Sequence, residues 1–107
     1  MLSDVDILRY IKLGELDIFP FNKAQLQPAS YDVRLGEHFL LTSINTGYSP
    51  LTGEYLLNPG EFILGETAES IQVPLSLVCR IEGKSSWARR GLVVHLTAGF
   101  VDPGWIG

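Results

Sequence analysis

The sequence has 107 residues, of which 46% are hydrophobic and 19% are charged. This length and balance are typical of one globular domain, residues 1–107, and exclude a chain of two domains. Eight Lys and Arg residues against twelve Asp and Glu residues give a formal net charge of −4. That charge argues against binding to duplex nucleic acid or to a membrane surface, because both need a broad basic footprint.

The distribution of apolar residues and cysteine narrows the class further. No window approaches the roughly 18 consecutive apolar residues of a membrane span, and the first residues lack the pattern of a signal peptide. We therefore expect a cytoplasmic protein. Cys79 is the only cysteine, so we expect neither an internal disulfide nor a cysteine cluster for zinc.

The first predicted element is a helix over residues 3–13. Ser3 followed by Asp6 resembles a weak capping box, and apolar residues recur at near-helical spacing until Gly14. After Gly14, short apolar or alternating runs are separated by turn-forming residues, as in an all-β sandwich or barrel. The strands predicted from these runs cover residues 31–35, 38–42, 61–65, 69–73, 76–82 and 91–96.

Two stretches differ from this pattern of short strands. Residues 42–59 contain three turn-forming clusters and indicate an excursion or a long hairpin. Near the end of the sequence, a turn at Asp102-Pro-Gly precedes the start of another strand, which would leave an open sheet edge. We therefore expect the chain to be part of something longer, or to complete its sheet in an oligomer.

The most informative segment for function is residues 82–91, Glu-Gly-Lys-Ser-Ser-Trp-Ala-Arg-Arg-Gly. Lysine, arginine, hydroxyls and free backbone N–H groups are the donors that phosphate oxygens need. The segment is not a Walker P-loop, because the glycine spacing and the surrounding βαβ unit are missing. On composition alone, a polar turn with solvated cations is an equally good interpretation.

Three other sets of residues have competing interpretations. Asp102 can orient a water or accept a hydrogen bond from a sugar, but starting the turn before Pro-Gly is locally favoured. Phe100 and Trp105 can stack on a base, although aromatic residues of a β-rich domain usually belong to the core. Asp32 and Arg34 share one face of a predicted strand, and we expect them to satisfy each other.

The two histidines lie far apart in sequence and match no zinc-enzyme pattern. We expect His38 to be an ordinary, partly buried histidine. His95 lies between residues 82–91 and the segment of residues 97–105 that contains Asp102, so a role in the site stays open. With no ligand set for zinc, any hydrolysis relies on carboxylates, polar groups and Mg²⁺ brought in by phosphates.

Four segments taken in order resemble the dCTP deaminase branch of the trimeric dUTPase superfamily. They are QPASYDVRLG (27–36), NPGEFIL (58–64), EGKSSWARRGL (82–92) and HLTAGFVDPGW (95–105). The resemblance spans almost the whole chain. It implies a distorted, mostly antiparallel β-barrel of the dUTPase-like, β-clip type, with one short N-terminal helix, and a homotrimer with active sites between subunits.

The resemblance also implies a reaction and its polar groups. The reaction is zinc-independent hydrolytic deamination of dCTP to dUTP, with Mg²⁺ bound through the triphosphate. Lys84, Ser85, Ser86 and Arg89 occupy the positions that contact phosphates and supply active-site polar groups. Ser85 and Arg89 are the catalytic candidates, because they would also hold the attacking water and polarise the base.

Positions 98–102 would line the nucleoside pocket by the same resemblance, with the Ala98 backbone near the base and Asp102 near the deoxyribose. Phe100 stands where deaminases that form only dUTP usually have an arginine. It resembles bifunctional enzymes that deaminate dCTP and also cleave the triphosphate to give dUMP, so that reaction is the alternative.

The general base of the family is a glutamate in an I-T-L-E strand just beyond the W-x-G, and the sequence ends at Gly107. The resemblance thus implies that the base, the last strands and the closing tail are absent from this chain. A general base contributes roughly 10²- to 10⁴-fold, so we expect little or no deaminase activity from these residues alone. We do not assign this role to other glutamates, because they do not stand at the position of the family's base: Glu61, Glu66, Glu69 and Glu82.

Three further interpretations stay open. One is a diphosphatase acting on dUTP, although pure dUTPases usually lack the QPASYDVRLG form. Another is a non-catalytic nucleotide-binding or subunit-interaction module, which would gain thermal stability from nucleotide without turnover. The last is a purely structural β-domain.

Overall fold

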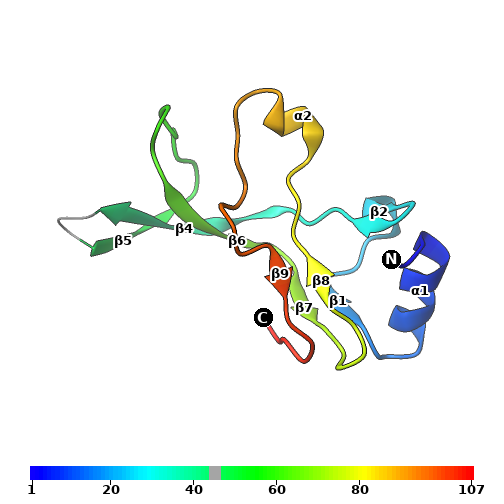
Figure 1. Cartoon of the computed structure of the whole chain (residues 1–107). Coiled ribbons are helices and arrows are strands. Elements are labelled where there is room, and N and C mark those ends of the chain that lie inside the picture. The colour runs from blue at the N-terminus through cyan, green and yellow to red at the C-terminus, as the bar shows by residue number, and fades with distance from the viewer. Residues whose placement is uncertain (44–46) are drawn as a thin grey trace.

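The computed structural model describes residues 1–43 and 47–107 and consists mainly of short strands (Figure 1). Its elements are α1 (Asp4–Lys12), β1 (Asp17–Phe19), the 3-10 helix η1 (Lys23–Gln25), β2 (Leu26–Gln27), β3 (Ser30–Tyr31), β4 (Leu35–Ser43), β5 (Gly47–Thr52), β6 (Ile63–Thr67), β7 (Ser70–Gln72), β8 (Cys79–Arg80), α2 (Ser85–Ala88) and β9 (Phe100–Val101). The strand pairs β1–β7, β2–β3, β4–β5, β4–β6 and β8–β9 are all antiparallel. This architecture confirms the predicted all-β, dUTPase-like fold class, here as four small sheets.

Helix α1 confirms the predicted N-terminal helix. The hydroxyl of Ser3 accepts a 3.3 Å hydrogen bond from the Asp6 backbone N–H, and Arg9 pairs with the Asp6 carboxylate at 2.7 Å. The helix ends before Gly14, whose φ of +73° is the left-handed conformation that favours glycine. Local capping signals are therefore sufficient to place this element.

Strands β4 and β5 form the long hairpin predicted around residues 42–59, with Phe39 opposite Leu51. Residues 44–46 of that stretch lie outside the described residues. Strand β6 pairs with the other edge of β4. The resulting three-stranded sheet projects from the rest of the chain (Figure 1). Its length contributes to overall extents of 46 × 28 × 25 Å.

The principal core is small and lies beneath α1. Ile7, Leu16 and Ile18 are buried, and partly buried neighbours surround them, including Phe21 and Tyr31 with stacked rings 5.5 Å apart. Elsewhere Phe39 and Val73 are the other buried apolar residues among those described.

The accessible surface is large for the mass of the chain. It measures 8368 Å², whereas a compact monomer of this size exposes about 5,900 Å². Many large apolar side chains contribute to the excess, and those between residues 87 and 106 are Trp87, Leu92, Val93, Val94, Leu96, Phe100, Trp105 and Ile106.

Some strand predictions were wrong in extent, because a strand needs a partner as well as a pattern. Residues 76–82 form a strand only at Cys79–Arg80, and residues 91–96 form none. The predicted strand 31–35 is interrupted at residues 32–34, where the Arg34 backbone N–H donates to the Glu69 side chain instead of to a strand. The other predicted strands fall within or overlap β4, β6 and β7.

The chain after residue 101 confirms the predicted turn and following strand segment. Gly104 has a φ of +84°, and residues after it run antiparallel to β7, with Ile106 opposite Gln72. The Val73 N–H donates to the Trp105 carbonyl at 2.9 Å. The last residues thus extend the β1–β7 sheet by one more strand-like segment.

The small core predicts a strong dependence on Ile7. Replacing Ile7, which is 8% exposed, with Ala should lower the free energy of unfolding by about 2–4 kcal/mol, because a cavity is left. Val5→Ala is the matched control on the same helix, since Val5 is 70% exposed, and should change stability by less than about 0.5 kcal/mol. Urea unfolding measures both, and equal effects of the two substitutions would contradict this description of the core.

Candidate functional site

Pairing of β8 with β9 brings together two segments that contain predicted site residues, 82–92 and 95–105. Arg80 lies opposite Phe100, and the Ile81 N–H donates to the Gly99 carbonyl at 2.6 Å. Gly99 is buried and has no room for a side chain, since a Cβ there would lie 2.9 Å from Cε1 of His95. Residues 82–92 and 95–99 therefore lie in the connection at one end of this short antiparallel ladder, and residues 102–105 follow β9 at the other end.

Helix α2 carries the predicted phosphate-binding residues on a single turn. Lys84 is its N-cap, Ser85 and Ser86 begin it, and Arg89 follows it. All four are exposed, and Figure 1 shows α2 standing away from the β8–β9 pair. Arg89 makes no ion pair with any described residue, so its guanidinium is available to a ligand.

The helical turn at residues 85–88 was not predicted, and backbone hydrogen bonds account for it. The Ala88 N–H donates to the Lys84 carbonyl and the Arg89 N–H to the Ser85 carbonyl, both at 3.0 Å. Gly91, with a φ of +90°, reverses the chain after it. The turn thus carries a lysine, two serine hydroxyls and an arginine close together in the sequence.

The predicted nucleoside-side residues form a second group, in the loop before β9, on β9 and in the turn after it. Ala98, Phe100 and Asp102 are exposed, and the guanidinium of Arg80 lies 5.9 Å from the centroid of the Phe100 ring. The Asp102 carbonyl accepts from the Trp105 N–H at 3.2 Å, which confirms that Asp102 starts the turn.

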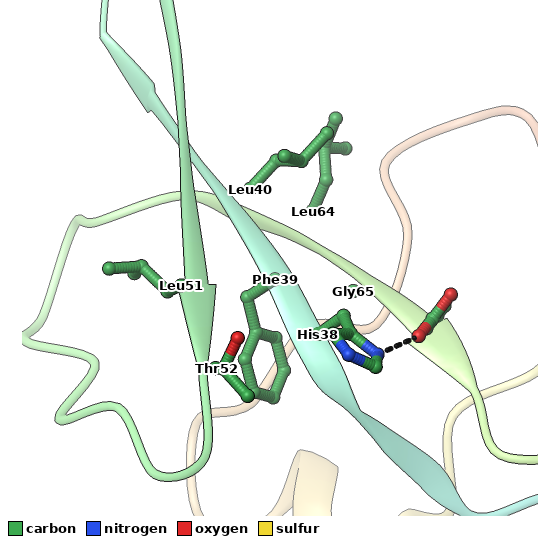
Figure 2. A pocket seen from close by; sticks show the side chains of 8 residues that line it. His38, Phe39, Leu40, Leu51, Thr52, Leu64 and Gly65 are labelled. Atoms are coloured by element: carbon green, nitrogen blue, oxygen red, sulfur yellow. Dashed lines mark hydrogen bonds and ion pairs between the residues drawn. The ribbon is translucent and has the colours of Figure 1, made fainter.

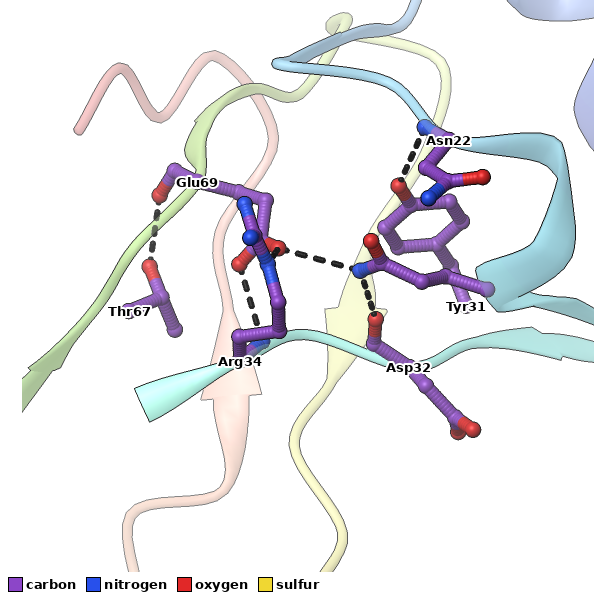
Figure 3. Close-up of polar contacts among 7 residues, drawn as sticks. Asn22, Tyr31, Asp32, Arg34, Thr67 and Glu69 are labelled. Atoms are coloured by element: carbon purple, nitrogen blue, oxygen red, sulfur yellow. Dashed lines mark hydrogen bonds and ion pairs between the residues drawn. The ribbon is translucent and has the colours of Figure 1, made fainter. Parts of the chain in front are cut away.

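A buried carboxylate that sequence reasoning missed organises the neighbouring loop. Glu69 is 2% exposed and accepts three hydrogen bonds: from the Arg34 N–H at 2.9 Å, the Arg34 Nε at 2.8 Å and the Gln25 amide at 3.0 Å (Figure 3). Burial opposes ionisation of Glu69, but the hydrogen bonds from Arg34 and Gln25 outweigh it and lower the pKa to about 2. Glu69 is therefore ionised at neutral pH.

The expected Asp32–Arg34 pair was wrong, because each residue has another partner. Arg34 pairs with Glu69, and Asp32 Oδ2 accepts from Lys84 Nζ at 2.7 Å and from the Gln27 amide at 3.1 Å. The pair between Asp32 and Lys84 joins the loop before β4 to the start of α2, 52 residues further along.

The histidines are placed differently from each other. The expectation that His38 is partly buried was wrong: its side chain is 71% exposed and its Nδ1 lies 2.8 Å from Glu66. His95 is half-buried against Gly99, and its Nδ1 is buried without a hydrogen-bond partner among the described residues.

A pocket elsewhere contains none of the predicted site residues. It is open, has a volume of about 310 Å³, and lies on the sheet formed by β4, β5 and β6 (Figure 2). Its lining is mainly apolar, with the His38–Glu66 pair at one side. It offers few polar groups for a charged ligand.

The described residues offer neither a metal-binding cluster nor a membrane-spanning helix. No group of three His, Cys, Asp or Glu side chains among residues 1–43 and 47–107 is arranged to hold a metal ion. No helix in the same part of the chain has the length and apolar character needed to cross a membrane.

Fold and site together define an all-β chain that presents a lysine, two serines and an arginine on one exposed helical turn. The sequence profile of the dCTP deaminase-like family matches residues 1–107, and the chain belongs to this family. The predicted resemblance is thereby confirmed.

Named relatives give the comparison more detail. The chain is 44% identical over 124 residues to "dCTP deaminase, dUMP-forming" of Rhodococcus erythropolis. It is 40% identical over 126 residues to the protein of that name from Dictyoglomus thermophilum, and 44% identical over 124 residues to that from Mycobacterium avium. Each alignment covers 100% of this chain and 65% of the relative, so the chain spans just under two thirds of their length.

The contacts of Glu69 predict a pH-dependent contribution to stability. Its pKa is lowered from 4.5 to about 2 in the folded chain, so its contribution is complete above pH 4.5 and is lost as the pH falls from 4.5 to 2. The shift corresponds to about 3 kcal/mol. Glu69→Gln should remove this dependence, whereas Glu54→Gln, at an exposed position, should retain it.

Urea unfolding at a series of pH values between 2 and 7 compares these variants. An acid-induced loss of stability that is as steep in Glu69→Gln as in the wild type would contradict the assignment.

Proposed function

We propose that this chain belongs to an enzyme that deaminates dCTP and cleaves the triphosphate, with dUMP as the product. The observation that carries the proposal is the placement of Lys84, Ser85, Ser86 and Arg89 on one exposed turn. The sequence-based prediction put dUTP first and dUMP second. The names of the relatives favour dUMP.

The triphosphate is assigned to the segment around α2. Arginine binds phosphate oxygens through two parallel N–H donors, and lysine and serine add single donors. Arg89 has no competing carboxylate among the described residues, while Arg90 lies over the Trp87 ring, 5.3 Å from its centroid. Arg89 is thus the better placed of the two arginines.

The nucleoside is assigned to the second group. The Ala98 backbone would meet the base and Asp102 the deoxyribose. Phe100 supplies an exposed ring at the position where enzymes that form only dUTP usually have an arginine. The aromatic residue supports the dUMP-forming reaction.

The deamination step adds water to C4 of cytosine and releases the amino group as ammonia, which leaves a carbonyl at C4. Ser85 and Arg89 are proposed to hold the water and polarise the base. The attacking water also needs a general base, which takes its proton and returns it to the departing amino group. Glu69 does not serve, because a carboxylate with a pKa of about 2 is a weak base and its oxygens are already occupied.

The general base is therefore proposed to be the glutamate that the family places beyond the W-x-G, outside these 107 residues. Cleavage of dUTP between its α and β phosphates by a second water yields dUMP and pyrophosphate, which balances the overall reaction.

Mg²⁺ is proposed to arrive with the nucleotide. Lys84, Ser85, Ser86 and Arg89 donate hydrogen bonds to anions, and a divalent cation instead requires oxygen acceptors such as phosphates and carboxylates. The donor set thus fits a triphosphate whose own oxygens hold Mg²⁺, and this ion would neutralise charge on the phosphates.

A homotrimer with sites between subunits is proposed from the exposed surface. The chain exposes about 2,500 Å² more than a compact monomer of its mass, and obligate interfaces bury about 2,000–5,000 Å². Helix α2 and strand β9, which carry residues of the two groups, lie apart on one chain (Figure 1). A neighbouring copy that supplies one group to the other would complete the site.

The binding proposal predicts that Arg89→Ala abolishes nucleotide-dependent stabilisation. At 100 times Kd, dCTP with Mg²⁺ should stabilise the wild-type chain by about 2.7 kcal/mol. Arg9→Ala is the control, because Arg9 lies on α1 and pairs with Asp6. Thermal unfolding with and without dCTP measures the effect, and equal stabilisation of Arg89→Ala and wild type would refute the assignment.

The reaction itself is tested by incubating the chain with dCTP and Mg²⁺ and separating dCTP, dUTP and dUMP by chromatography. A chain extended through the I-T-L-E strand should yield dUMP, and Arg89→Ala should abolish that product. Accumulation of dUTP without dUMP by the extended chain would contradict the dUMP-forming proposal.

A further inference from the structure

Asp32 is fixed in place before it meets Lys84. Its backbone N–H donates to the Gln25 carbonyl at 2.9 Å, and its own carbonyl accepts from the Gln25 amide at 2.7 Å. The Gln27 amide holds Oδ2 at 3.1 Å. Because three hydrogen bonds already order this residue, pairing with Lys84 costs less entropy than an ordinary surface ion pair.

Gln25 also ties this arrangement to the buried carboxylate. The same amide nitrogen that donates to the Asp32 carbonyl donates to Glu69 Oε1 at 3.0 Å, and Figure 3 shows Asp32 and Glu69 on either side of these bonds. The side chain of Glu69 has no exposed surface. A buried, fully hydrogen-bonded group therefore anchors the loop that presents Asp32.

The Lys84 ammonium has three N–H donors, and the 2.7 Å contact with Asp32 occupies one of them. Two remain for phosphate oxygens. Lys84 is also the residue from which α2 starts. Holding its ammonium thus restrains the whole turn that carries Ser85, Ser86 and Arg89.

We propose that Asp32 is a positioning residue, anchored through Gln25 to Glu69, that holds Lys84 and the start of α2 in the arrangement that binds a triphosphate. This inference rests on the proposed function, since it concerns the lysine assigned to the phosphates. The proposal predicts a change in anion binding opposite to the one that charge alone predicts. Removing a negative charge beside a phosphate site should strengthen anion binding, whereas removing a positioning group should weaken it.

The test measures binding of inorganic tripolyphosphate and of dCTP with Mg²⁺ by calorimetry to the 107-residue chain. Asp32→Ala should weaken both about tenfold, because a charge-assisted hydrogen bond that orders the site is lost. Asp32→Asn keeps an acceptor for Lys84 and should bind at least as well as the wild type. Asp17→Ala, at an exposed aspartate on β1, is the matched control and should not weaken binding.

A double-mutant cycle identifies the residue through which Asp32 acts. Asp32→Ala should have no further effect in a Lys84→Ala background. Tighter binding by Asp32→Ala, or a full additional loss in the Lys84→Ala background, would overturn the proposal. A merely structural role would lower the melting temperature and leave the effects of the two substitutions additive.

A second readout keeps this test independent of the proposed function. Trp87 lies on α2, so its fluorescence in a Trp105→Phe background reports the position of the turn without any ligand. Asp32→Ala should change its emission and anisotropy, and Asp17→Ala should not. If the wild type fails to bind tripolyphosphate, the proposed function fails, while a changed Trp87 signal still supports the positioning role and an unchanged signal overturns it.

Discussion

The ionised carboxylate of Glu69 is the constraint on which the arrangement of this chain depends. A buried charge is tolerated only when partners compensate for the lost water, and Arg34 and Gln25 provide that compensation. Meeting this requirement diverts the backbone at residues 32–34 from strand geometry. The diverted loop in turn places Asp32 beside Lys84. The hydrogen bonds that the buried Glu69 requires thus help to position Lys84, in the segment assigned to the triphosphate.

The remainder of the fold buries few apolar side chains and exposes many. Five apolar side chains are buried among the described residues, and most large apolar side chains of the second half are exposed. Residues 91–96 have the composition of a strand and no partner. Such a surface suits a chain that gains much of its burial from neighbours, in agreement with the proposed homotrimer and with a chain that spans 65% of its relatives.

Sequence patterns predicted the elements that local interactions determine. The Ser3 cap and Gly14 placed α1, and the turn clusters of residues 42–59 placed the β4–β5 hairpin. Strand 91–96 failed because pairing depends on a partner that no local pattern encodes.

The site followed the same division between local and long-range information. Recognisable motifs supplied Lys84, Ser85, Ser86 and Arg89, and the structure places them on one turn, although their roles stay predictions. Glu69 was missed because its partners lie 35 and 44 residues away. No spacing within its own segment marks it. The wrong pairing of Asp32 with Arg34 has the same origin, since nearness in sequence does not decide which charges meet.

The central claim, that the segment from Lys84 to Gly91 binds the triphosphate, is tested most directly by hydrogen–deuterium exchange of its backbone amides. With dCTP and Mg²⁺, the amides of residues 84–91 should exchange more slowly than in the free chain, and deoxycytidine should not have this effect. Unchanged exchange at residues 84–91 with bound dCTP, or equal protection by deoxycytidine, would contradict the account.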